Sequence, residues 1–394
     1  MESIFLSVRD LWRQHTVTRC IALAFIGGML TSFRLWWKPA LFPSLPLFAP
    51  LTNIPSGVSN VLAVALVLAL AGMVLTTKRF AAIIALAAVV LLTLLDQMKW
   101  QPWVYLYLLL MLPLTIPGRS ERLILFYWQL VIAGIYLWSG IHKINTNFVD
   151  GFFGRIMSNV FGASILEGGL APYLGYCAGI LESLAGVGLL FNRTRIPALI
   201  FTIAMHAAIV GYIVVHDHLQ FNVVLVPWNL AMIAFNMLLF ARFNSNAMAC
   251  AKQLWKNKSG KLADALPVGV MLVFVWILPV FNFTGHVDHY LSFSLFSNKP
   301  SSFYVAVRDD QLGKVPAQVR KHTVSIAGLS GGQIIDVDAW ARDELGVPFY
   351  PERRVFTKLS SFFCALGAEE GSIVFLEVKQ HGKEKEIDHF GCGE

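Results

Sequence analysis

The chain has 394 residues, of which 56% are apolar and only 14% are charged, and its mean hydropathy is +0.61. Soluble domains carry about 25% charged residues, so this much apolar surface must be shared with lipid. The composition excludes a disordered chain, a coiled coil and a nucleic-acid binder, and the net charge of +7 is expected to lie in cytoplasmic loops. Five cysteines without a Cys-x-x-Cys motif predict neither a zinc site nor a disulfide framework.

Apolar runs long enough to cross a bilayer recur along most of the chain. They predict an all-α polytopic membrane bundle over residues 19–285. Residues 1–18 form a separate N-terminal segment, which is either a helix on the membrane surface or a frayed polar end. The nine expected spans are at about 19–37, 57–76, 79–97, 101–117, 122–141, 171–191, 196–215, 220–241 and 266–284.

Lysine and arginine are distributed unevenly among the predicted loops. About three lie on the side of the N-terminus for each one on the other side, and such an excess marks the cytoplasmic face. We therefore expect an integral protein of the bacterial inner (cytoplasmic) membrane with its N-terminus in the cytoplasm. Nine spans then place residues 286–394 outside the cytoplasm.

Residues 286–394 alternate strand-like and turn-like segments. Strands are expected at 303–307, 323–326 and 373–378, and short helices at 339–345 and 353–366. This predicts a small, mostly β extracytoplasmic domain to which a protein partner could bind. Cys364 and Cys392 would share the oxidising side of the membrane, where they either pair or stay free, because a sequence does not give their separation.

Two ionisable residues fall near the middle of predicted spans, Glu182 in the sixth and His206 in the seventh. Counted from the turn near Arg193, their depths differ by only about 3 Å, so we expect a hydrogen-bonded Glu182–His206 pair. The functional interpretation is a proton-handling pair that lines a substrate cavity. The structural alternative is an interhelical hydrogen bond worth about 0.6 kcal/mol.

Histidines and carboxylates gather at the outer ends of the predicted helices. Imidazoles and carboxylates suit zinc or iron. Nothing fixes the spacing between these loops, so we expect no metal, and polar aqueous loops are the alternative explanation. The weak candidate ligands are His216, His218, His286 and His289.

Lys143 ends the fifth predicted span, beside His142 and before Asp150. A lysine in low-dielectric surroundings can act as a base, whereas a snorkelling lysine keeps its ammonium in water, and both interpretations are open. Asp96 lies with Gln101 at the outer end of the hairpin between the third and fourth predicted spans, where it could form an ion pair with Lys143. The tryptophans and tyrosines of this hairpin are otherwise typical of an interfacial belt.

Four segments in chain order, 96–107, 136–151, the surroundings of His206, and 290–296, together resemble the HTTM superfamily, which includes the vitamin K-dependent γ-carboxylases. The likeness extends over about residues 15–300. It implies a nine-helix membrane core with Lys143 at the position of the family's catalytic base.

The resemblance also implies a catalytic group, a cavity and a lipid-soluble quinone or hydroquinone as substrate or cofactor. His142 and Asp96 would act with Lys143, and the cavity would be lined by Glu182, His206, Trp103, Gln101 and Asp150. Trp103 replaces a catalytic histidine of the family, and an indole cannot accept a proton, so full γ-carboxylation is not expected. We expect a carboxylase-like or quinol-dependent membrane enzyme. The alternative is a non-enzymatic membrane subunit, or a maturation or immunity factor for a secreted peptide or partner protein.

Overall fold

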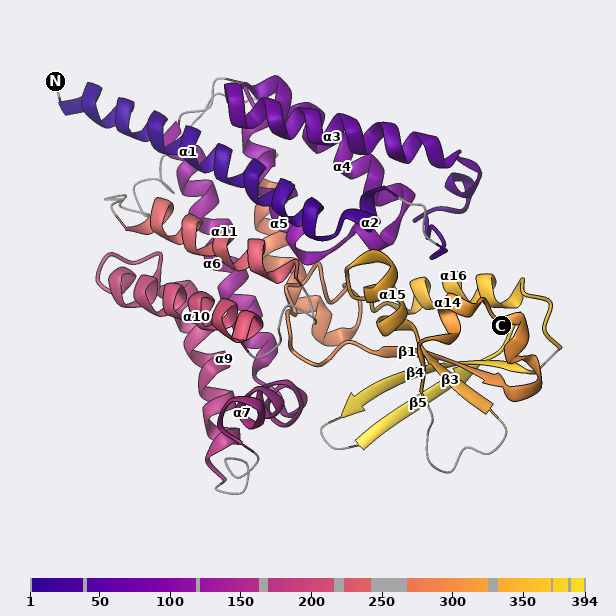
Figure 1. The fold of residues 1–394 in the computed structure, drawn as a ribbon. Helices are drawn as coiled ribbons and strands as arrows, with labels where there is room; N and C mark the ends of the chain where they lie inside the picture. The colour runs from indigo at the N-terminus through magenta and orange to yellow at the C-terminus, as the bar shows by residue number, and fades with distance from the viewer. Residues whose placement is uncertain are drawn as a thin grey trace.

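The computed structural model describes residues 2–37, 41–117, 121–162, 169–215, 223–241, 268–324, 332–369, 371–381 and 384–392. These residues form a helical bundle followed by a small domain with an antiparallel sheet (Figure 1). The helices of the bundle are α1 (Glu2–Thr31), α2 (Phe33–Trp36), η1 (Ala49–Asn53), α3 (Ser56–Thr76), α4 (Arg79–Leu95), η2 (Gln97–Lys99), α5 (Pro102–Met111), η3 (Leu112–Thr115), α6 (Glu121–Lys143), η4 (Asn147–Phe153), α7 (Gly154–Phe161), α9 (Leu170–Gly188), α10 (Arg195–Val215), α11 (Leu225–Phe240), η5 (Leu272–Ile277) and η6 (Leu278–Thr284).

Four helices within the described ranges are long and apolar enough to cross a membrane, namely α3, α6, α9 and α10. The chain is therefore an integral membrane protein, as its composition predicts. The expected nine spans are not confirmed. The span expected at 19–37 falls in α1 and α2, which are not among these four, and the other apolar helices of the described residues are shorter. Helix α4 has 17 residues and α11 has 16, which is about 25 Å at 1.5 Å per residue, against about 30 Å of hydrocarbon.

Helix α5 differs most from the expected span at 101–117. It ends after ten residues and continues as the tighter turn η3. Ten residues cover about 15 Å, half of the hydrocarbon core. Every residue from Trp103 to Met111 is buried, so this helix is apolar on all sides because the bundle surrounds it.

Helix α1 runs without a break through the expected boundary at residue 18. Residues 2–18 are thus helical, while their position on a membrane surface stays a prediction. The buried face of α1 includes Val17, Ile21 and Phe25, which join the core of the bundle.

The C-terminal domain contains a five-stranded antiparallel sheet in the order β2-β3-β1-β4-β5. The strands expected at 303–307 and 373–378 are confirmed, as are both short helices to within two residues, whereas residues 325–326 lie outside the described residues. Cys364 and Cys392 form a disulfide with their Cα atoms 5.8 Å apart. The elements are β1 (Ser302–Arg308), η7 (Asp309–Lys314), α14 (Ala317–Arg320), β2 (Thr323–Val324), β3 (Gly332–Asp336), α15 (Val337–Leu345), α16 (Arg353–Cys364), β4 (Ile373–His381) and β5 (Glu384–Phe390).

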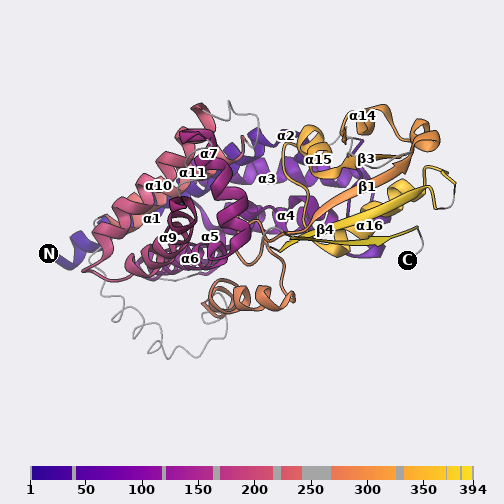
Figure 2. The same ribbon diagram turned by 90° about the horizontal axis from the view of Figure 1, so that it is seen from below.

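Helices α15 and α16 cover one face of the sheet, where Phe303 of β1 stacks on Phe356 of α16 with ring centroids 4.7 Å apart. The same two helices lie between the sheet and the bundle (Figures 1 and 2). Phe42, which precedes η1, packs 4.5 Å from Trp340 of α15. Lys358 of α16 donates to the carbonyls of Pro46 and Leu47. We call the end of the bundle that this domain covers the docked end.

Polar contacts also fix the domain at the docked end. The Arg354 guanidinium donates to both carboxylate oxygens of Asp288 and, at 2.8 Å, to Gln97 Oε1. Tyr350 donates its hydroxyl to Asp288 at 2.6 Å. Burial, and then the neighbouring carboxylate of Asp288, raise the pKa of Tyr350 well above its ordinary value of 10.0.

Candidate functional site

Lys143 and Glu182 form an ion pair between α6 and α9. The Lys143 Nζ donates to Glu182 Oε2 at 2.6 Å and to Ser139 Oγ at 2.9 Å. The two side chains are only 13% and 7% exposed. The ammonium is thus directed at a carboxylate inside the bundle and not at open water, which is a different geometry from snorkelling.

The pair depends on a close crossing of α6 and α9 that small residues permit. A Cβ added to Gly140 would lie 2.4 Å from the backbone nitrogen of Ser183, and one added to Gly186 would lie 2.6 Å from the carbonyl of Ala133. Small residues that let backbones approach are typical of helix contacts within membranes. The crossing brings the last residue of α6 beside the middle of α9.

A second polar cluster joins α6, α10 and α11. The Tyr136 hydroxyl lies 2.6 Å from His206 Nε2 and accepts a hydrogen bond from Asn236 Nδ2 at 2.6 Å. His206 Nδ1 lies 2.6 Å from Asn229 Oδ1, and all four residues are buried. The imidazole therefore has a partner on each nitrogen, which fixes its orientation.

The two expected pairings are wrong. Both nitrogens of His206 are taken by Tyr136 and Asn229, so His206 does not bond to Glu182. Between α6 and α9 the chain forms η4 and α7, which lie beyond the end of α6. Helix α9 therefore begins beyond that end, and the residue of α9 that contacts Lys143 is Glu182. The expected Asp96–Lys143 pair is replaced by a local one, because Asp96 contacts Lys99 at 3.2 Å.

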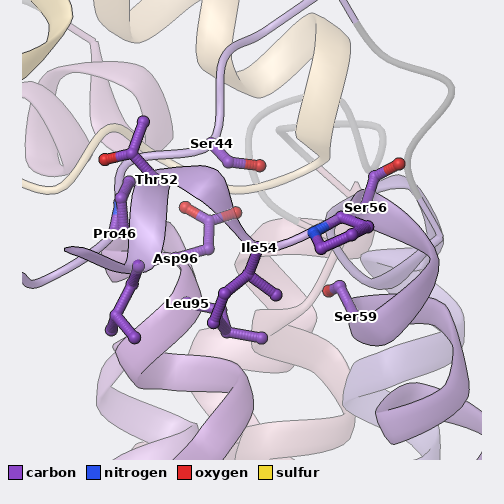
Figure 3. A pocket seen from close by; sticks show the side chains of 10 residues that line it. Ser44, Pro46, Thr52, Ile54, Ser56, Ser59, Leu95 and Asp96 are labelled. Atoms are coloured by element: carbon purple, nitrogen blue, oxygen red, sulfur yellow. The ribbon is translucent and has the colours of Figure 1, made fainter. Parts of the chain in front are cut away.

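Asp96 caps the short helix η2 at the docked end. Its Oδ1 accepts hydrogen bonds from the backbone nitrogens of Met98 and Leu45. It also lines a small cavity with serines from the loop before α3 and from α3 itself (Figure 3). The cavity of about 70 Å³ has room for a few water molecules and not for a ring-bearing substrate.

The remaining residues predicted for the cavity lie apart from the ion pair. Gln101 is buried and donates to the carbonyls of Met98 and Pro348 in the domain interface. Trp103 packs in an aromatic cluster, 5.5 Å from Phe25. Asp150 is exposed in η4.

The histidines singled out in the sequence are dispersed. His142 is buried and stacks on Phe283 at 4.7 Å, and His286 lies in an exposed turn beside Thr284. His289 lies 3.2 Å from Glu352, whereas His216 and His218 lie outside the described residues. Among the residues that the structure describes, no group of three His, Cys, Asp or Glu side chains could hold a metal ion.

Sequence reasoning missed Ser139, Tyr136, Asn229 and Asn236. The two asparagines lie seven residues apart in α11, and so on one face of that helix. Asparagine is costly inside a bilayer unless it is hydrogen-bonded, so this spacing was a readable signal of a buried polar contact.

The fold and this site define a class: an integral membrane protein with an ion pair buried between two helices of its bundle and a docked C-terminal domain with an antiparallel sheet. Residues 121–218, which include Lys143, Glu182 and His206, match the family model of the methylamine utilisation protein MauE. The expected membership of the HTTM superfamily is therefore wrong, since the family that matches is a different one. No curated protein matches the chain, and no solved structure does.

Three of the residues that suggested the HTTM superfamily have packing or capping roles in this structure. Tyr136 and Gly140 belong to the contacts of α6, and Asp96 caps a local turn. Aromatic, glycine and capping residues recur at such positions in many helical bundles, so their order alone does not separate one membrane family from another.

Proposed function

We propose that Lys143 and Glu182 form an acid–base centre inside the membrane bundle that acts on a lipid-soluble substrate with an ionisable hydroxyl group, such as a quinol. The observation that carries the proposal is the 2.6 Å contact between two ionisable side chains in apolar surroundings. A buried ion pair adds little net stability compared with apolar residues of the same size. Ionisable groups at membrane depth are therefore better explained by function than by packing.

The extent of the family match supports the same site. It covers α6 to α10, where the ion pair and His206 lie, and it leaves out the C-terminal domain. A property shared with that family would thus belong to the membrane core.

In the proposed step Lys143 is the base. Its ammonium proton passes to Glu182 along their hydrogen bond, and the free amine then takes the proton of the substrate hydroxyl. The products are a substrate oxyanion, a protonated Glu182 and a Lys143 ammonium. The ammonium lies beside the oxyanion and stabilises it in a low-dielectric environment.

The test uses a decyl-substituted hydroquinone added to the full chain in lipid nanodiscs, with the ultraviolet shift from phenol to phenolate as the readout. We expect the shift with the wild type and its loss in Lys143→Met and Glu182→Gln. The matched control is the double exchange Lys143→Glu with Glu182→Lys, which keeps an ion pair between α6 and α9 but moves the amine. A folded Lys143→Met protein that still ionises the probe would remove Lys143 from the mechanism.

A second candidate function is an accessory membrane subunit or maturation factor for a partner protein. It is favoured by the contacts through which Arg354, Lys358 and Phe42 join the C-terminal domain to the bundle. The disulfide between Cys364 and Cys392 supports an extracytoplasmic position, because disulfides persist in oxidising compartments. A domain in that position would meet exported proteins.

Protease added to intact spheroplasts tests this second candidate. An extracytoplasmic domain should be cleaved at exposed loops without breaking the membrane, and a tag at the N-terminus should be protected. Full protection of residues 286–394 would place the domain in the cytoplasm and exclude an exported partner.

A further inference from the structure

A cavity of about 240 Å³ lies at the end of the bundle opposite to the docked end. Helix α3 starts at the docked end and α4 returns to it, so the turn between them marks the opposite end. The cavity lies between this turn, residues 114–117 with the start of α6, and residues 11–18 of α1. Its lining residues are Leu11, Gln14, Thr18, Thr77, Lys78, Arg79, Ala82, Leu114, Ile116, Pro117, Glu121 and Ile124.

Two adjacent cations, Lys78 and Arg79, line this cavity. Arg79 donates its Nε to the carbonyl of Thr115 at 2.6 Å, which holds the guanidinium at the cavity while leaving its two terminal nitrogens to another acceptor. Within the described residues the Lys78 ammonium has no hydrogen-bond or ion-pair partner. Glu121 is the acidic side chain in the lining, so the cations outnumber it.

Exposed apolar side chains flank the same turn. Leu75, three residues before Lys78, is 77% exposed, and Phe80, directly after Arg79, is 69% exposed. Trp12 of α1 is also largely exposed on this side, as is usual for an anchor at a membrane interface. The apolar helices α3 and α4 end and begin at this turn, as helices do where they leave the hydrocarbon core of a bilayer.

We propose that this cavity binds the phosphate group of a membrane phospholipid. Lys78 and Arg79 hold the phosphate, and the acyl chains lie against Leu75 and Phe80. This arrangement suits an amphiphile. The cations of the turn complement the negative charge of a phosphate, and the exposed apolar side chains that flank the turn suit acyl chains. The site is on the opposite end from the C-terminal domain and does not include the Lys143–Glu182 pair.

The test measures lipid binding to the full chain in detergent by native mass spectrometry. The probes are phosphatidylglycerol, diacylglycerol with the same chains, and inorganic phosphate. Each basic residue near a membrane surface contributes roughly 1 kcal/mol, so Lys78→Gln should weaken phosphatidylglycerol binding about fivefold, and Lys78→Gln with Arg79→Gln about 25-fold. Lys78→Gln is the safer variant, because the Lys78 ammonium has no partner among the described residues that the fold would lose.

Arg122→Gln is the matched control, since Arg122 is exposed on the same end but does not line the cavity. Arg122→Gln should bind phosphatidylglycerol as tightly as the wild type does. Diacylglycerol, which lacks the phosphate, should bind to each protein more weakly than phosphatidylglycerol binds to the wild type. Equal losses in Lys78→Gln and Arg122→Gln would mean general surface attraction and overturn the site. Saturable binding of inorganic phosphate as tight as that of the lipid would overturn the lipid as occupant.

Discussion

The Nζ of Lys143 and the Oε2 of Glu182 lie 2.6 Å apart, although 39 positions separate the two residues in the chain. Their contact joins the last residue of α6 to the middle of α9. Glycine contacts fix the spacing of the two helices there, so the pair and the crossing depend on each other. Both are therefore targets for substitution.

Removing one member of the pair should destabilise the protein more than removing both. Lys143→Met leaves Glu182 buried without its cation, and the loss of one partner of a buried pair costs about 3–5 kcal/mol. Lys143→Met with Glu182→Leu should recover most of that loss. Chemical unfolding of the purified protein in detergent measures the free energy of unfolding of each variant. If the losses in the two single variants add up to the loss in the double variant, the two side chains are not coupled.

Gly186→Ala should push α6 and α9 apart. The new methyl group would lie 2.6 Å from backbone atoms of Ala133 and Leu137, which cannot rotate away, and overpacking of this kind costs about 1–3 kcal/mol. The control is Gly211→Ala in α10, where the added Cβ meets nothing within 4 Å. It should leave the melting temperature unchanged or raise it, because alanine favours helix by up to about 1 kcal/mol over glycine. Equal melting temperatures of the two variants would contradict the close crossing.

Tyr350→Phe should change how stability responds to alkaline pH. The folded-state pKa of Tyr350 is raised, by burial first and by Asp288 next. Its protonated form therefore stabilises the fold fully below pH 10, and this contribution is lost as the pH rises toward the folded-state pKa. The variant should lose about 1.5–3 kcal/mol at neutral pH, and its difference from the wild type should shrink above pH 10. Urea unfolding from pH 8 to 11 measures this, and a constant difference would contradict the raised pKa.

Phe42→Ala should loosen the C-terminal domain from the docked end. Phe42 is buried between Trp340 and Phe349, and truncating such an aromatic costs about 3–5 kcal/mol. Hydrogen exchange should then rise in α15 and α16 but stay unchanged in α6 and α9. Phe48→Ala is the control, since Phe48 is exposed. Unchanged exchange in Phe42→Ala would mean that polar contacts alone hold the domain.

Local patterns were sufficient for most elements of the fold. The apolar runs predict α3, α4 and α6 closely, and alternation in the tail predicts β1 and β4, because hydropathy and strand periodicity are properties of neighbouring residues. The Asp96–Lys99 contact joins residues only three positions apart, but the sequence led us to expect Lys143 as the partner of Asp96.

Contacts between distant segments could not be read in this way. Nothing local shows that α5 is surrounded by other helices and is not a lipid-facing span, since both environments favour an apolar helix. Nor does the sequence show that α9 begins beyond the end of α6, which directs Glu182 to Lys143 and leaves His206 to Tyr136 and Asn229.

The sequence by itself therefore determined that the chain enters a membrane, because removing that much apolar surface from water is the dominant favourable contribution to its free energy. It also determined that a small domain with a sheet follows the membrane helices, because alternation along a strand is a local pattern. The tertiary structure alone decided which charges meet. A partner for a buried charge is chosen by the offset and spacing of packed helices, and these depend on glycines and loop lengths far from the charges themselves.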